Sequence, residues 1–208
     1  PGCALCFWGI AYTLGPNYNV PMLPERAQAA WQAIQAAQAA AASATPVEQG
    51  LIGALAKRFK GPEWLDPVAM APFNAAYAEA MREVAKRYPE DHDVQVLYAE
   101  AMMNTNPWKL WTPQGEPAEG TSNIVSTLEF VLARDPKHAG ANHFYIHAVE
   151  ASKTPGRALP AADRLAALMP GAGHIVHMPA HIYYRVGRYA DASKANRRAA
   201  EIDEAYLK

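Results

Sequence analysis

The chain has 208 residues, of which 50% are hydrophobic and 19% are charged, and its formal net charge is −1. A chain of this length and apolar content can bury a sizeable core in one or two domains. The near-neutral charge argues against a nucleic-acid or an anionic membrane as partner, and no apolar run approaches the roughly 20 residues of a membrane span. Because the sequence begins with Pro1, we expect a fragment or a processed form of a longer chain.

Alanine-rich periodic segments between prolines and glycines predict an almost entirely helical chain without strands. The start of one predicted helix has a typical pattern: a capping residue at Thr45, a proline in the first turn at Pro46 and a glutamate three residues after the cap at Glu48. A loop rich in Pro, Gly and Trp spans residues 106–117. In chain order, we predict helices over residues 3–14, 24–43, 46–60, 68–88, 92–104, 121–134, 138–151, 155–168, 173–186 and 188–206.

The only two cysteines, Cys3 and Cys6, have a Cys-x-x-Cys spacing. This spacing suits a disulfide, a pair of metal ligands or two small apolar side chains. Phe7 stands where a c-type haem attachment motif requires histidine, so covalent haem is disfavoured, and a zinc site usually needs a second cysteine pair. We therefore expect the two cysteines to be small apolar residues of the interior.

Six of the seven histidines lie in two short segments. His143 and His147 are four residues apart, as are His177 and His181, so each pair stacks on one face of its helix. His174 precedes His177 by three residues and joins the same stripe. The two pairs are offset by 34 residues, which is the period of a tetratricopeptide repeat (TPR). The sequence thus places the same two histidines on equivalent faces of successive repeats.

Gly187, Tyr189, Ala192 and Ala199 then follow the pattern of the second helix of a TPR. More specifically, the chain resembles a group of bacterial TPR proteins with histidine-rich repeats. The segments that carry the resemblance are 1–11, 98–101, 106–108, 143–152, 177–183 and 185–189.

The resemblance and the 34-residue offset together predict an all-α fold, a right-handed TPR-like α-solenoid of antiparallel helix pairs. No low-complexity linker interrupts the helices, so we expect a single domain over residues 1–208. The resemblance implies that the histidine face lines the concave groove, where such solenoids bind ligands. It implies no particular activity.

The histidine pairs favour a metal site, because neutral imidazole is a common transition-metal ligand and two imidazoles four residues apart can chelate one ion. Ligand type alone does not choose between copper, iron and zinc. His174, His138 and Glu150 are the next candidates, and Glu150 could instead hold a ring N–H. The predicted metal ligands are His143, His147, His177, His181, His174, His138 and Glu150.

Four further residues are candidates for substrate binding. Tyr184 and Arg185 adjoin His181 and suit an anionic substrate. Glu100 and Tyr12 occupy, in earlier helices, the position that His181 occupies in the last repeat.

Three functions remain open. The first is a metal-binding TPR-like protein with a histidine-lined groove, with metal-dependent catalysis as one option. The second is a metal-free TPR module that binds a protein or peptide, in which the histidines are polar contacts or a structural network. The third is a haem-binding electron-transfer protein. No nucleophile–base pair, phosphate loop or dinucleotide fingerprint is present, so catalysis would depend on the metal alone. We expect a small-molecule or peptide ligand, and a bacterial periplasmic or secreted location rather than a cytoplasmic one.

Overall fold

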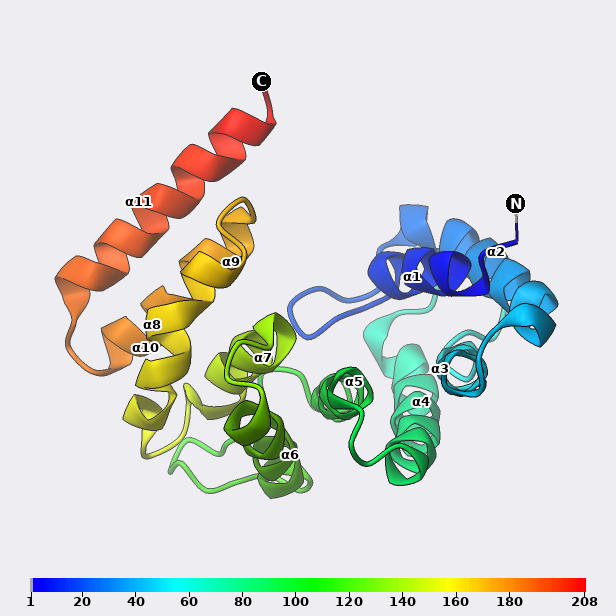
Figure 1. Ribbon diagram of the computed structural model, residues 1–208, viewed down its shortest axis with the longest axis horizontal. Coiled ribbons are helices and arrows are strands. Elements are labelled where there is room, and N and C mark those ends of the chain that lie inside the picture. The colour runs from blue at the N-terminus through cyan, green and yellow to red at the C-terminus, as the bar shows by residue number, and fades with distance from the viewer. Residues whose placement is uncertain (1) are drawn as a thin grey trace. The chain divides into compact units, whose positions relative to one another are not determined.

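The structure is a computed structural model that describes residues 2–208, and in that range the fold is all-α (Figure 1). The helices are α1 (Ala4–Leu14), α2 (Pro24–Ala40), α3 (Pro46–Ala56), α4 (Pro67–Arg87), α5 (His92–Met103), α6 (Thr121–Arg134), α7 (Ala139–Val149), α8 (Leu159–Leu168), α9 (Gly173–His177), α10 (Pro179–Arg185) and α11 (Tyr189–Tyr206). Two 3₁₀ segments, η1 (Ala41–Ser43) and η2 (Pro155–Ala158), follow α2 and precede α8. None of these helices is long and apolar enough to cross a membrane.

The predicted helix 173–186 consists of two helices, because a proline interrupts it. α9 ends at His177 and α10 begins at Pro179. Pro179 has no N–H to donate to the preceding turn, and its ring crowds the carbonyl group four residues earlier. The interruption lies between His177 and His181, so the geometry of this pair differs from that of two residues in one regular helix.

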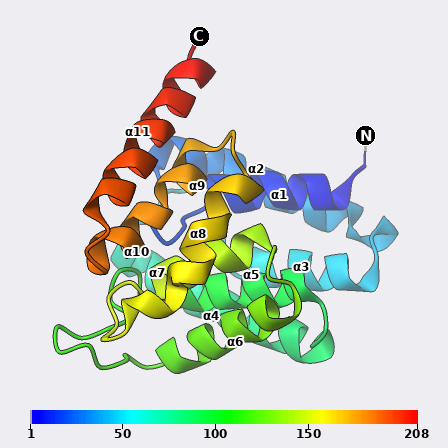
Figure 2. The same ribbon diagram turned by 60° about the vertical axis from the view of Figure 1, so that its left-hand side comes forward.

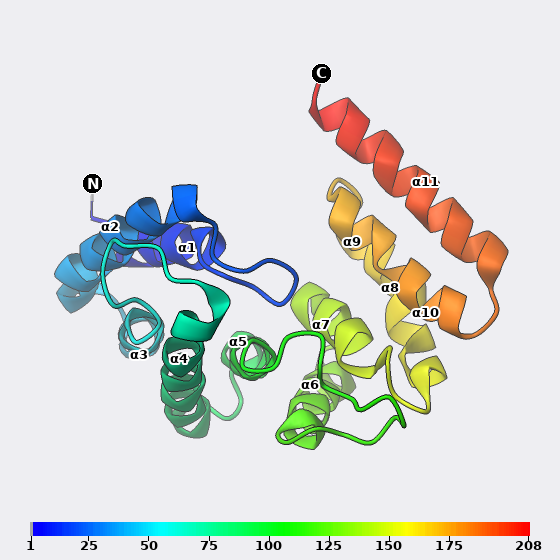
Figure 3. The ribbon, with the colours of Figure 1, turned by 180° about the vertical axis from the view of Figure 1, so that it is seen from behind.

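The chain divides into two compact units, one ending at Trp108 and the other beginning at Lys109. In the first unit α1 packs on α2, α3 on α4 and α4 on α5; Figure 3 shows α1 and α2 side by side. In the second unit α6 packs on α7, α7 on α8, and α9 and α10 on α11 (Figure 2). This arrangement confirms the predicted all-α fold of helices packed in consecutive pairs. A single domain over residues 1–208 remains a prediction.

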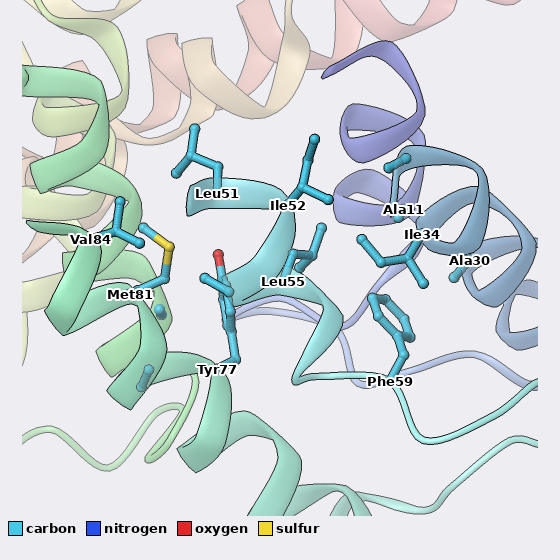
Figure 4. Close-up of a cluster of buried hydrophobic side chains, with 14 of the residues drawn as sticks. Ala11, Ala30, Ile34, Leu51, Ile52, Leu55, Phe59, Tyr77, Met81 and Val84 are labelled. Carbon is cyan, nitrogen blue, oxygen red and sulfur yellow. The ribbon is translucent and has the colours of Figure 1, made fainter. Parts of the chain in front are cut away.

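The core of the first unit combines alanines with a few large apolar side chains (Figure 4). Ala11 and Ala30 are fully buried, and their small side chains let the backbones of α1 and α2 approach closely. Ile34 of α2 and Leu55 of α3 are also fully buried, and Figure 4 shows them facing each other. Helix-to-helix packing of this kind, rather than helix propensity alone, stabilises a chain of such short helices.

The expectation that the cysteines belong to the interior is wrong. Cys3 and Cys6 are both exposed, and a disulfide joins them. Cys3 is the N-cap of α1, and its sulfur accepts a hydrogen bond from the backbone N–H of Cys6 at 3.2 Å. The N-cap residue and the third helical residue are neighbours across the first turn, so the two side chains meet at the helix end instead of facing the core.

Candidate metal site

Five histidine rings of the second unit form one closed set of contacts, which we call the histidine cluster. The ring of His143 lies with its centroid 5.0 Å from that of His174 and 5.1 Å from that of His147. The His147 ring lies 5.4 Å from that of His181, which lies 4.8 Å from that of His177. His174 and His177, at 6.2 Å, close the set. The structure therefore brings together five of the histidines predicted as metal ligands, which lie on α7, α9 and α10.

The cluster runs from solvent into the interior. His174 is exposed, and His143, His177 and His181 are half-buried. His147 is only 2% exposed, because this part of α7 is buried on all sides, as its neighbours Ile146 and Ala148 also show. An ion could therefore enter the cluster from solvent at His174 and lose its bound water molecules on reaching the buried ring of His147.

Glu150, the C-cap residue of α7, orients two of the rings. Its Oε1 lies 3.0 Å from Nδ1 of His147, and its Oε2 lies 2.6 Å from Nδ1 of His181. Burial alone raises the pKa of Glu150, but the hydrogen bonds from His147 and His181 outweigh burial and bring the pKa to about 2. An ionised carboxylate only accepts hydrogen bonds, so both rings carry their proton on Nδ1. Nε2 is then the nitrogen of each ring that a metal ion would bind.

Two pairs of Nε2 atoms lie within hydrogen-bond distance of each other. Nε2 of His143 is 3.1 Å from Nε2 of His174, and Nε2 of His177 is 2.9 Å from Nε2 of His181. His177 Nδ1 lies 2.7 Å from the side-chain oxygen of Asn196, which accepts a hydrogen bond from it. His177 and His181 therefore both carry hydrogen on Nδ1, and two lone pairs meet at Nε2. Such a contact repels unless a cation, either a proton or a metal ion, lies at it.

Burial keeps the deeper rings neutral. The pKa of His143 lies well below its usual value, first because of burial and then because His147, His174 and His181 are nearby. Burial also lowers the pKa of His147, although Glu150 opposes this change. The pKa of His174, at the exposed edge of the cluster, is lowered by the partial burial of its ring and by the neighbouring histidines His147, His177 and His181. Rings that stay neutral at pH 7 offer their lone pairs to a metal without first losing a proton.

Two groups of three residues have donor atoms within 4.8 Å of one another. One is His147, Glu150 and His181, in which the carboxylate already accepts the two Nδ1–H groups. The other is His143, His147 and His174, all of them imidazoles. Either group could hold a metal ion, and the second offers three nitrogen donors of one type.

His138, a further predicted ligand, lies at the N-terminus of α7. It is the N-cap residue, and its Nδ1 accepts a hydrogen bond from the backbone N–H of Ala141 at 3.2 Å. The ring therefore serves the helix end, which satisfies a backbone donor that has no partner within the helix.

The four predicted substrate-binding residues fall in different surroundings. Tyr184 and Arg185 are exposed on α10, and the Tyr184 ring meets that of Tyr189 edge-on at 5.5 Å. Tyr12 and Glu100 belong to the first unit, where burial and Glu100 raise the Tyr12 pKa well above its usual value. Burial raises the pKa of Glu100, against the opposing effects of Arg58 and an Asn104 hydrogen bond.

Sequence reasoning missed Asn196, which holds the His177 ring from α11. A single asparagine in a helix rich in alanine and arginine carries no signal of this kind. It is found only once α11 is seen to pack against α9.

No protein-family model and no curated protein matches the chain. Among the solved structures similar to it are two of MamA. MamA MSR-1 C2 has a TM-score of 0.54 and 14% identity, over 88% of this chain and 95% of that chain. MamA AMB-1 C2221 has a TM-score of 0.50 and 12% identity, over 86% and 95%. MamA is a TPR protein, and at these identities the likeness concerns the fold alone. The chain thus has a TPR-like helical fold, reached independently by its helix pairs and by these structures.

Proposed function

We propose that the protein is a metal-binding TPR-like protein whose histidine cluster holds a transition metal ion. The observation that carries the proposal is the pair of close Nε2 contacts, 3.1 Å between His143 and His174 and 2.9 Å between His177 and His181. Two imidazole nitrogens bound to one ion at bond lengths near 2.0–2.1 Å, with an angle near 90–110°, are separated by roughly 3 Å. These separations fit two ligands on adjacent positions of a metal.

The primary site is His143, His147 and His174, whose donor atoms lie within 4.8 Å of one another. Glu150 supports it by holding Nδ1 of His147, so that the ring would bind the ion through Nε2. His177 and His181 form an adjoining pair that can complete the coordination or hold a second ion.

The donor set favours zinc, copper or iron over calcium or magnesium. Imidazole nitrogen suits the borderline transition metals, whereas calcium and magnesium prefer oxygen ligands. Histidines can also hold a haem iron, and a Soret band in the visible spectrum of the purified protein would support that alternative.

Protein purified without a histidine tag tests the proposal. After loading with Zn²⁺ or Cu²⁺ and desalting, elemental analysis is expected to find at least about one ion per chain. His174→Ala is the informative variant, because His174 is exposed and its loss leaves the helices intact. His92→Ala is the matched control, since His92 lies at the start of α5 in the first unit.

Loss of bound metal in His174→Ala, but not in His92→Ala, supports the site. Equal metal content in the two variants, with unchanged circular dichroism, would overturn it. In that case the second candidate function gains support: a metal-free protein- or peptide-binding module, which the TPR-like fold favours in general.

A further inference from the structure

The first unit contains a pocket of about 300 Å³. It is lined by the loop that joins α1 to α2, by the first turns of α4 and by the segment that follows α5. Its walls are largely apolar and include Met22, Met70, Tyr18 and Trp108. The Tyr18 and Trp108 rings lie 5.1 Å apart. A volume of this size is at the lower end of small-molecule sites.

Two asparagines of the pocket each contact a charged residue buried behind it. Arg58 is 0% exposed, and its Nε donates to Oδ1 of Asn74 at 2.9 Å. Glu100 is 1% exposed, and its Oε1 accepts a hydrogen bond from Nδ2 of Asn104. Both Asn74 and Asn104 line the pocket.

The contacts with Arg58 and Glu100 determine whether the oxygen or the NH₂ group of each asparagine remains for a ligand. A guanidinium group can only donate, so Asn74 must turn its oxygen towards Arg58, and its NH₂ group is left over. The Glu100 oxygen accepts the NH₂ group of Asn104, so the oxygen of Asn104 is left over. Amide orientation is often ambiguous, and here the buried partners decide it. Because both asparagines line the pocket, the groups left to meet a ligand there are the NH₂ group of Asn74 and the side-chain oxygen of Asn104.

Residues in and near the pocket include buried polar atoms without partners and one strained backbone conformation, neither of which packing alone requires. Within residues 2–208, Nη1 and Nη2 of Arg58 and the hydroxyl of Tyr77 are buried without a hydrogen-bond partner. Unsatisfied buried polar atoms are costly and rare. Trp108, which lines the pocket, has a φ of 62°, a left-handed conformation that is strained for a bulky residue, and the residue is 55% exposed. Strain of this kind tends to collect at ligand sites.

We propose that this pocket binds a small uncharged molecule that carries a carboxamide or lactam group on an aromatic or apolar body. The C=O and N–H groups of an amide match the donor of Asn74 and the acceptor of Asn104. The aromatic and methionine side chains receive the apolar body. A carboxylate ligand would leave the acceptor of Asn104 facing an oxygen, and a cationic amidine would leave the donor of Asn74 facing an N–H group.

Three probes of nearly equal size test this recognition on the full chain: benzamide, benzoate and benzamidine. Titration followed by NMR is expected to show benzamide binding at least about tenfold more tightly than either charged probe. Asn104→Leu is expected to remove that preference, and Trp108→Ala to weaken all three probes while circular dichroism stays unchanged. Asn123→Leu, an exposed asparagine of α6, is the matched control. Equal binding of the three probes, no benzamide binding at 20 mM, or unchanged binding by Asn104→Leu would each overturn the proposal.

Glu100 is a positioning residue in this scheme, because it acts through Asn104. In Glu100→Gln the new amide can donate as well as accept, so Asn104 is free to turn its NH₂ group into the pocket. The pocket would then present the NH₂ groups of both Asn74 and Asn104, and the negative charge of Glu100 would be gone. Both changes favour binding of an anion such as benzoate. The ratio of benzamide to benzoate affinity is therefore expected to fall at least about fivefold. A change that weakens all three probes to the same degree would show that Glu100 only supports the fold.

Discussion

Oε2 of Glu150 and Nδ1 of His181 lie 2.6 Å apart, although Glu150 caps α7 and His181 belongs to α10. The other oxygen of the same carboxylate holds His147 of α7. One carboxylate thus couples two histidines of successive repeats. It fixes the tautomer of both rings at once and links α7 to α10.

Replacing Glu150 by glutamine is expected to weaken metal binding by roughly 10–100-fold. The NH₂ group of glutamine would face one of the two Nδ1–H groups, so at least one ring would turn or change its tautomer. Competition with a metal-binding dye measures the affinity. Glu201→Gln on α11, where Glu201 is paired with Arg198, is the control and should bind metal like the unmodified protein. Unchanged affinity in Glu150→Gln would mean that the ion does not depend on these tautomers.

Replacing Cys3 and Cys6 by serine should leave the bound metal unchanged. The two sulfurs are bonded to each other, so neither is a thiolate ligand, and they belong to the first unit whereas the histidine cluster belongs to the second. Elemental analysis of the double variant checks the expectation. Loss of metal with intact circular dichroism would mean that the cysteine segment takes part in the site.

The stability of the first unit should depend strongly on Leu55. This side chain is 0% exposed in the core, and truncation to alanine removes buried methyl groups and leaves a cavity. We expect Leu55→Ala to lower the free energy of unfolding by about 2–5 kcal/mol in urea titrations. Val68→Ala should change it by less than about 0.5 kcal/mol, because Val68 is 84% exposed. Similar losses in both variants would contradict the assignment of this core.

Glu48 gives a pH dependence with a definite sign. Hydrogen bonds from the backbone and the hydroxyl of Thr45 hold the pKa of this glutamate below its ordinary 4.5. A lowered folded-state pKa means that the contact stabilises the protein above the unfolded pKa and is lost as the pH falls through the folded pKa.

The difference in melting temperature between the unmodified protein and Glu48→Gln should therefore be largest near pH 7 and shrink below about pH 4.5. Glu119→Gln, at an exposed glutamate outside any helix, should show no such trend. A difference in melting temperature that grows as the pH falls would contradict a stabilising contact between ionised Glu48 and Thr45.

The sequence by itself determined the helices and the faces that carry histidine. Helix starts such as Thr45-Pro46 and Asp66-Pro67 are encoded by residues within one turn of the chain, so local reading is enough. The spacing of His143 and His147 likewise sets a common face, because 3.6 residues complete one turn. The interruption at Pro179 follows from a local rule as well, although the repeated histidine pattern suggested a continuous helix.

Only the tertiary structure decided which side chains meet across helices. His143 meets His174, Glu150 meets His181 and Asn196 meets His177, each pair joining different helices. The orientation of the amides of Asn74 and Asn104 likewise depends on Arg58 and Glu100, which come from other turns or helices. Helical periodicity specifies the direction in which a side chain leaves its own helix, whereas a contact between helices depends on how their surfaces pack. That packing is a property of the whole unit and cannot be read from any one segment.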